Sequence, residues 1–271
     1  MLNFVRQKQF MHPLQLLLIN GKINDSSNYP LEIWGLDIDS NRSIYYAKPF
    51  RNIGINTFPT AKEIIGCEMA LRFDLPTPSY NIINIDDSKL TSHYSVNEVR
   101  KFHKGYKFCS KKIDQYLGFN PYVSVGFLRE YEIAGIFAFD VIMQNLDRGG
   151  LRGKPNLLIN DDSLVMIDHE LTLSFISSQQ PIRNYENNIR IYPSNSHVLI
   201  EHLKVIKEKS YIFDEFLEHL RLLNINSLNS VFDDMDKYNI EYGEKLDYFA
   251  YFEWCKNNIA IIKKSLIGMI Q

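Results

Sequence analysis

The sequence predicts an α+β protein in which a small, β-rich N-terminal part is followed by a larger, mainly helical C-terminal part. Three observations predict this fold class. Short apolar runs separated by turn residues fill most of the first 86 positions. Helical periodicity of apolar residues dominates the remaining chain. A length of 271 residues, with 45% hydrophobic and 13% aromatic side chains, supports a large core.

In the N-terminal part, three apolar runs are predicted to form an antiparallel meander. Stretches rich in Asn, Asp and Ser separate the runs, and these residues favour turns. A helix is predicted over 60–73, because Pro59 and the Thr60-x-x-Glu63 pattern of a capping box precede a periodic apolar segment. A further strand returns over 79–85. The strands of the meander cover 14–19, 31–38 and 43–48.

The C-terminal part is predicted to be helical with one β-hairpin inside it. The segment 130–145 is so strongly apolar that we expect its helix to be buried on most of its surface. Two short runs, 156–160 and 164–168, flank a polar turn and indicate the hairpin. Three or four helices are expected from Val198 to the C-terminus. We place the domain boundary after residue 86, which divides the chain into 1–86 and 87–271.

The charge balance excludes an extended surface for binding polyanions. Thirty Lys and Arg residues stand against 32 Asp and Glu residues, and the net charge is -2. Cys67, Cys109 and Cys255 lie far apart and form no CxxC pair, which is typical of reduced, structural thiols. No segment approaches the ~20 apolar residues of a membrane span. We therefore expect a cytoplasmic protein that binds no membrane and makes no direct contact with nucleic acid.

Four polar residues occupy positions where a buried side chain is costly without a function or a partner. Lys48 ends the third strand, and Asp147 follows the apolar helix at the end that repels negative charge. Asn156 and Asp168 begin and end the predicted hairpin. Taken singly, Lys48 could be a solvated strand end, and Asp147 could belong to an ordinary helix terminus closed by glycine.

The hairpin could bring two of these residues together as metal ligands. If Asp161 to Ser163 form a three-residue loop, Asn156 lies directly opposite Asp168, with β-carbons ~5 Å apart. An amide oxygen and a carboxylate at that separation can share a Mg²⁺ ion, which takes water and phosphate as its other ligands. A two-residue loop would shift the pairing and remove this match.

The order of these residues along the chain is the order that kinases use for phosphoryl transfer. In that reaction a first Asp orients the acceptor hydroxyl, and an Asn and a second Asp hold metal against the phosphates. An upstream lysine pairs with a helical glutamate, and both Glu63 and Glu68 could be the partner of Lys48. We choose Glu63, which shares a helix face with Gly66. Alternatively, Glu63 could only cap its own helix. We expect Glu68 to be solvated.

The loop over 21–30 occupies the position of a phosphate-covering loop. Gly21, Ser26 and Ser27 could contact phosphate oxygens through backbone amides and hydroxyls, although a plain polar hairpin fits the segment equally well. His169, beside Asp168, is expected to have a structural hydrogen-bonding role. No HExxH or GxSxG motif is present.

At these residues the sequence resembles the HipA-like kinases. The matching segments occur in the order found in the family. They are Tyr45-Tyr46-Ala47-Lys48-Pro49-Phe50, Glu63-Ile64-Ile65 running to Leu75-Pro76-Thr77-Pro78, residues 139–148, Pro155-Asn156-Leu157-Leu158, and Ile167-Asp168-His169. The resemblance implies a two-lobed, protein-kinase-like fold with ATP and Mg²⁺ bound between the lobes.

The resemblance also implies roles for individual residues. Lys48 would contact ATP, with Glu63 as its partner. Asp147 would be the catalytic aspartate, and Asn156 and Asp168 would bind the metal. The implied activity is phosphorylation of serine or threonine in a protein, with a toxin or growth-arrest role in some members. The residues expected to bind the nucleotide are Lys48, Gly21, Ser26, Ser27 and Asn145.

One departure from the family pattern keeps other functions open. Nine positions separate Asp147 from Asn156, which is a longer spacing than we expect, and Arg152 and Lys154 in this loop could instead bind an anionic substrate. The alternatives are a kinase-fold nucleotide-binding protein or pseudokinase that acts as a partner-binding module, and a small-molecule or lipid kinase. For a protein kinase we expect a protein substrate and leave room for a regulatory protein partner.

Overall fold

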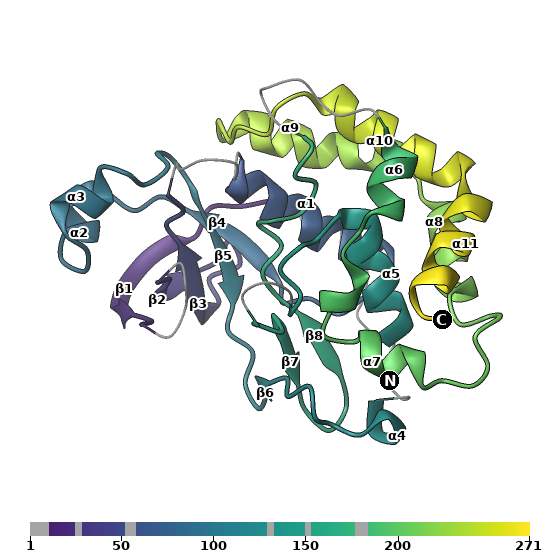
Figure 1. Cartoon of the computed structure of the whole chain (residues 1–271). Helices are drawn as coiled ribbons and strands as arrows, with labels where there is room; N and C mark the ends of the chain where they lie inside the picture. The colour runs from purple at the N-terminus through teal and green to yellow at the C-terminus, as the bar shows by residue number, and fades with distance from the viewer. Residues whose placement is uncertain (1–10, 25–28, 52–57, 129–132, 150–152, 177–183) are drawn as a thin grey trace.

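The N-terminal part of the chain forms a five-stranded antiparallel sheet with the strand order β1-β2-β3-β5-β4 (Figure 1). The computed structural model describes residues 11–24, 29–51, 58–128, 133–149, 153–176 and 184–271. The fold is α+β, with this β-rich sheet followed by a mainly helical C-terminal part, which confirms the predicted fold class. The strands are β1 (Gln15–Lys22), β2 (Leu31–Leu36), β3 (Arg42–Lys48), β4 (Tyr80–Ile83) and β5 (Lys107–Lys111).

The first three strands form the predicted meander, and β3 occupies the middle of the sheet. β5 separates β3 from β4, and it begins well after the domain boundary predicted at residue 86. The sheet therefore takes one strand from the part of the chain that was predicted to be helical. The pairing of β3 with β5 sets Lys48 opposite Phe108, so Lys48 ends a central strand and not an edge strand.

Helix α1 (Pro59–Arg72) is buried along almost its whole length, from Pro59 to Ala70. Pro59 occupies the first turn, where its missing N–H costs nothing. The residue before the helix is Phe58, in a left-handed conformation and without a side-chain cap, so the capping box predicted at Thr60 does not form. Thr60 lies inside the helix, and the side chain of Glu63 does not cap the helix and can make another contact.

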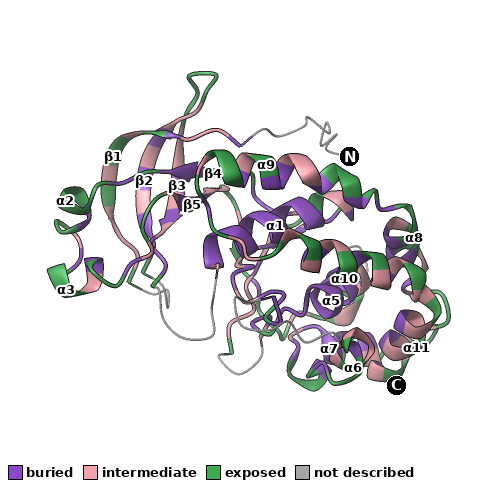
Figure 2. Ribbon diagram, turned by 90° about the horizontal axis from the view of Figure 1, so that it is seen from above, coloured by how far each residue is buried: buried purple, intermediate pink, exposed green. Residues whose placement is uncertain are grey.

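The helical part is built around α5 (Ile133–Met143), which is buried on nearly every side as predicted (Figure 2). β7 and β8 form the predicted hairpin, and the unpredicted β6 adds a third strand to it. After residue 198 the chain has more helices than the three or four predicted. The remaining elements are α2 (Asp87–Leu90), α3 (Val96–Val99), β6 (Leu117–Gly118), α4 (Val125–Leu128), β7 (Leu157–Ile159), β8 (Leu164–Met166), α6 (Tyr185–Arg190), α7 (Ile200–Lys204), α8 (Asp214–Leu222), α9 (Asn229–Lys237), α10 (Lys245–Asn257) and α11 (Ile259–Met269).

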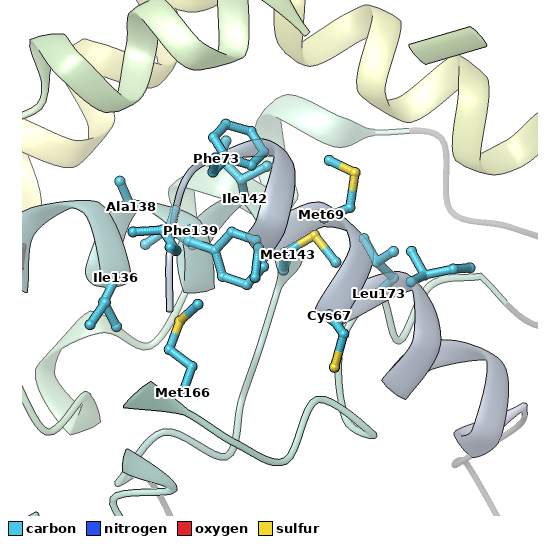
Figure 3. Packing of buried hydrophobic residues seen from close by; sticks show 14 of the residues in the cluster. Cys67, Met69, Phe73, Ile136, Ala138, Phe139, Ile142, Met143, Met166 and Leu173 are labelled. Atoms are coloured by element: carbon cyan, nitrogen blue, oxygen red, sulfur yellow. The ribbon is translucent and has the colours of Figure 1, made fainter. Parts of the chain in front are cut away.

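One apolar core joins α1 of the N-terminal part to α5 and the hairpin of the C-terminal part. Figure 3 shows Met69 of α1 and Phe73, which directly follows α1, in one cluster with Phe139 of α5 and, below it, Met166 of β8. The ring of Phe73 meets that of Phe139 edge-on at 5.9 Å and stacks on Phe216 of α8 at 4.5 Å. Because burial of this apolar surface couples the two parts, the position of α1 is tied to the helical part.

A second core cluster covers the other face of the sheet. Neighbouring residues of a strand point to opposite faces, and accordingly Phe108 belongs to the first cluster and Cys109 to the second. Residues of α2 and α3, among them Leu90 and Val99, complete this second cluster. All three cysteines are buried and free, as expected for structural thiols. In the described part of the chain no helix is long and apolar enough to cross a membrane.

Gly66 allows α1 to approach the segment that follows β8. A Cβ on Gly66 would lie 2.3 Å from the Cβ of His169, a distance that backbone or helix movement must relieve. We expect Gly66→Ala to lower the free energy of unfolding by about 1–3 kcal/mol, as overpacking does in other cores. Chemical denaturation measures this change.

Gly268→Ala is the matched control for this prediction. Gly268 lies in α11, and no atom is within 4 Å of the Cβ that alanine would add. Its substitution should leave stability unchanged or raise it by up to about 1 kcal/mol through helix propensity. Equal effects of the two substitutions would show that the contact with His169 does not constrain α1.

Candidate functional site

Lys48, Glu63 and Asp168 meet where the sheet, α1 and the segment after β8 come together. Lys48 Nζ lies 2.5 Å from Glu63 Oε1 and 3.0 Å from Asp168 Oδ1. The side chains are 12%, 1% and 16% exposed, respectively. Residues 48, 63 and 168 are far apart in the sequence, and the structure brings them together. The sequence predicted the pair of Lys48 and Glu63, and it did not predict the contact of Lys48 with Asp168.

Glu63 is bonded on both sides of its carboxylate. Its second oxygen, Oε2, accepts a hydrogen bond from the backbone N–H of His169 at 2.9 Å. The alternative that Glu63 only caps its helix is therefore wrong. Glu68, which we expected to be solvated, is buried and accepts a hydrogen bond from Tyr80 Oη at 2.7 Å. Glu68 also pairs with Arg72 one turn along α1, so the two glutamates have separate partners.

The electrostatics of the three groups follow from burial and mutual attraction. Burial opposes the charged form of Lys48, but the carboxylates of Asp168 and Glu63 outweigh it and raise the lysine pKa. Burial also opposes ionisation of Asp168, and the ammonium of Lys48 nevertheless lowers the pKa of this carboxyl. Burial raises the pKa of Glu63, against the attraction of Lys48. The site therefore holds a charged lysine between two acidic side chains.

Asp147 and Asn156 form a second contact next to this cluster. The amide Nδ2 of Asn156 donates to Asp147 Oδ2 at 3.1 Å and to the Asp147 carbonyl at 2.8 Å. The nine-position spacing does not keep them apart, because the described residues at the two ends of the intervening loop lie close together. The N–H of Gly149 donates to the carbonyl of Lys154 at 2.5 Å and closes the loop at its base.

The predicted pairing of Asn156 with Asp168 is wrong by one residue. Leu157 pairs with Met166, and the N–H of Ile167 donates to the Asn156 carbonyl at 3.0 Å. The turn of the hairpin has two residues, Asp161 and Asp162, and not three, and this sets the register.

Both hairpin ends leave the strand conformation at the predicted metal ligands. Asn156 has φ 47° and Asp168 has φ 65°, in the left-handed region where few non-glycine residues lie. In these conformations the side chain of Asn156 contacts Asp147, and that of Asp168 contacts Lys48. Tertiary contacts therefore direct the two side chains to the site, in place of the cross-strand pairing expected from the sequence.

Asp140 and Arg148 form a fully buried ion pair next to Asp147, and this pair was not predicted from the sequence. Arg148 Nε lies 2.8 Å from Asp140 Oδ2, and both side chains are 0% exposed. His197 contacts the same carboxylate oxygen at 3.1 Å. A signal was present, because Asp140 is the one charged residue inside the apolar segment of α5, where an unpaired carboxylate would be costly.

Asn145, expected among the nucleotide-binding residues, is used inside the loop. Its side-chain amide donates to Asp140 Oδ1 at 2.8 Å and accepts from the Asp147 N–H at 3.2 Å. The residue is 1% exposed. The structure thus gives Asn145 a contact that shapes the loop, where the sequence led us to expect a contact with the nucleotide.

The remaining residues expected at or beside the site are Gly21, Ser26, Ser27 and His169. Gly21 lies in β1 opposite Glu32, and no atom is near the Cβ it lacks. Ser26 and Ser27 lie outside the described residues. His169 contributes its backbone N–H to Glu63, but its ring nitrogens have no hydrogen-bond partner among the described residues, contrary to the role we expected. Burial lowers the pKa of the His169 ring to about 3, which keeps it neutral.

The acidic side chains do not form a complete metal site by themselves. Within the described segments, no group of three or more His, Cys, Asp or Glu side chains could hold a metal ion. Asn156 and Asp168 nevertheless supply oxygen atoms at the same end of the hairpin, the ligand type that a hard cation prefers. This donor set fits a metal that takes its other ligands from phosphate and water.

The fold and these contacts define a kinase-type site, in which a strand lysine pairs with a helical glutamate beside an Asp, Asn and Asp set. The sequence model of the HipA-like kinases matches residues 38–221. This match spans well over half of the chain, and the chain belongs to the HipA-like kinase family. Membership in this family supports a kinase-type function.

The other comparisons give little additional information. No curated protein matches the chain. Among solved structures, the chain is similar to one described as the open conformation of CtTel1, with a TM-score of 0.31 and 11% sequence identity. The alignment covers 94% of this chain and 12% of that protein, so the chain spans a small part of its length.

The buried His197 predicts a loss of stability in acid. Its pKa is lowered from the ordinary value of 6.5, chiefly by burial. Below pH 6.5 the unfolded chain therefore binds a proton that the folded protein does not bind, and unfolding becomes easier as the pH falls. We expect His197→Gln to show a smaller loss of stability between pH 7 and pH 5 than the unmodified protein, measured by denaturation at each pH.

His219→Gln is the control for this measurement. His219 lies half-buried on α8, away from Asp140 and His197 on the chain. Its substitution shows how far a change of histidine to glutamine by itself alters the pH dependence of unfolding. If His197→Gln alters it no more than His219→Gln does, the ring of His197 does not stay neutral in the fold.

Proposed function

We propose that this chain is an ATP- and Mg²⁺-dependent kinase that transfers phosphate to a serine or threonine hydroxyl of a protein. The observation that supports it is the meeting of Lys48, Glu63 and Asp168 beside Asp147 and Asn156. Phosphoryl transfer depends on positioning and on neutralisation of charge, and these five side chains provide both.

In the proposed reaction, four of these side chains bind the nucleotide and the metal or hold another side chain in place. Lys48 binds the nucleotide phosphates, and Glu63 holds the lysine in place from α1. Asn156 and Asp168 would hold Mg²⁺, which neutralises charge on the phosphates. Lys48 and Asp168 are already 3.0 Å apart, so a phosphate and a metal would be recognised at neighbouring points.

Asp147 is the residue proposed to receive the acceptor proton. The hydroxyl oxygen attacks the γ-phosphorus, its proton passes to the Asp147 carboxylate, and the bond from phosphorus to the ADP oxygen breaks. The hydrogen bond from Asn156 to Oδ2 fixes the orientation of this carboxylate. The same bond supports turnover over the alternative of a binding module, because the long loop leaves Asp147 and Asn156 in contact.

The protein acceptor, a toxin or growth-regulating role and a regulatory protein partner belong to the proposal as well. Their support is membership in the HipA-like kinase family. The first experiment is incubation with labelled ATP, alone and with a cell lysate. A protein kinase should label serine or threonine in itself or in a lysate protein, whereas a binding module should show only stabilisation by ATP.

Asp147→Asn should lower the rate of phosphoryl transfer by about 10²–10⁴-fold, because the amide cannot accept the proton. ATP should still raise the melting temperature of this variant, since Lys48 and Asp168 are unchanged. Asp161→Asn, in the exposed turn of the same hairpin, is the control and should retain full transfer. Undiminished labelling by Asp147→Asn would remove Asp147 from the reaction.

Asp168→Asn should weaken the binding of ATP in the presence of Mg²⁺. Calorimetry with and without the metal separates the two contributions. In the unmodified protein, chelation of Mg²⁺ should weaken ATP binding, and in Asp168→Asn chelation should have a much smaller effect because a metal ligand is already lost. Equal metal dependence in both proteins would contradict a metal-binding role for Asp168.

A further inference from the structure

Asp140 is linked through Asn145 and Arg148 to the segments that carry Asp147, Asn156 and Asp168. It lies on α5, is 0% exposed, and belongs to none of the groups that would touch ATP or the acceptor. We infer that Asp140 is the positioning residue that holds Asp147, Asn156 and Asp168 in place for phosphoryl transfer. This inference rests on the proposed function and adds a residue to it.

The first connection runs from Asp140 to Asp147 through Asn145. Asp140 Oδ1 accepts a hydrogen bond from Asn145 Nδ2 at 2.8 Å, and Asn145 Oδ1 accepts from the Asp147 N–H at 3.2 Å. The hydroxyl of Tyr192 donates to the Asn145 carbonyl at 2.7 Å and secures the same residue from another segment. The backbone of Asp147 therefore depends on the carboxylate two turns earlier in the chain.

The second connection runs from Asp140 to the hairpin through Arg148. The guanidinium donates from Nε to Asp140 Oδ2 at 2.8 Å and from Nη2 to Oδ1 at 3.2 Å. Its third nitrogen, Nη1, donates to the Ile167 carbonyl at 2.8 Å and to the carbonyl of Asn156. The planar fork of arginine allows these bonds to form together, and an ammonium has no such fork.

These carbonyls belong to the two points where the hairpin is strained. Asn156 has a positive φ, and the Ile167 carbonyl directly precedes Asp168, which also has a positive φ. A non-glycine residue in the left-handed region is unfavourable and persists where surrounding contacts determine it. Arg148 supplies those contacts at both strands, and Asp140 in turn holds Arg148.

His197 completes the set of donors around the carboxylate. The N–H of Leu199 donates to His197 Nδ1 at 3.1 Å, so Nδ1 carries no proton. The proton of the neutral ring is then on Nε2, which donates to Asp140 Oδ2 at 3.1 Å. Asp140 thus accepts hydrogen bonds from Asn145, Arg148 and His197. An asparagine at this position would place its NH₂ group, a hydrogen-bond donor, against other donors.

Asp140→Asn tests the inference at nearly constant side-chain volume. We expect kcat per folded molecule to fall by about 100-fold, because displacement of the catalytic base and of the metal ligands slows phosphoryl transfer. The KM for ATP should rise as well, because displaced Asn156 and Asp168 would hold Mg²⁺ and its bound ATP less well. A role in stability alone would lower the folded fraction and leave kcat per folded molecule unchanged, which would overturn the inference.

Two further variants guard the result against misfolding. Glu68→Gln is the control, because Glu68 is also buried and paired with an arginine, Arg72, but lies outside the network. It should lower stability and leave kcat unchanged. Arg148→Lys keeps the positive charge beside Asp140 and removes the fork. If Asp140→Asn does not fold, Arg148→Lys is decisive: a fall of kcat of about 100-fold supports the inference and an unchanged kcat overturns it.

Hydrogen exchange separates this inference from the proposed function. In Asp140→Asn the amides of Asp147, Ile167 and Val198, which are bonded within or beside the network, should exchange faster while those of β1 to β3 do not change. If the unmodified protein shows no transfer but these amides respond, the proposed function fails and the positioning role stands. If transfer is present and these amides do not respond, the positioning role fails alone.

Discussion

The carboxylate of Glu63 is the point on which the arrangement of the site depends. One oxygen binds the ammonium of Lys48 on β3, and the other accepts the backbone N–H of His169 after β8. A sheet strand, a helix and a loop of the helical part therefore meet at one side chain that is 1% exposed. Burial of such a charge is unfavourable unless it is fully paired, so these three elements hold their positions together.

Close packing gives this contact its geometry. α1 approaches the segment after β8 closely enough for Glu63 to reach it because Gly66 has no side chain beside His169. One and two turns further along the same side, Met69 and Phe73 pack the end of α1 against α5 and the hairpin. Apolar burial thus supplies most of the attraction between the two parts of the chain, while the polar contacts select one relative position.

A second buried carboxylate, Asp140, has the corresponding position in the helical part. It neutralises Arg148, whose remaining bonds reach the carbonyls of Asn156 and Ile167. The hairpin end that carries Asp168 is therefore held by Lys48 and Glu63 of the N-terminal part and by Arg148 of the helical part. Both acids follow the same rule, because a charge in an apolar core persists where cations and hydrogen-bond donors surround it.

The sequence by itself determined the fold class, the first three strands, α1 and α5, and the pairing of Lys48 with Glu63, because these follow from local periodicity and from residue types in a characteristic order. It did not determine the register of the hairpin, the placement of β5 inside the sheet, the burial of Glu68 or the role of Asn145. Each of these depends on partners distant in the chain or on a turn length that differs by one residue. Only the tertiary structure decided them, since a buried polar group takes the orientation that its neighbours in space can satisfy.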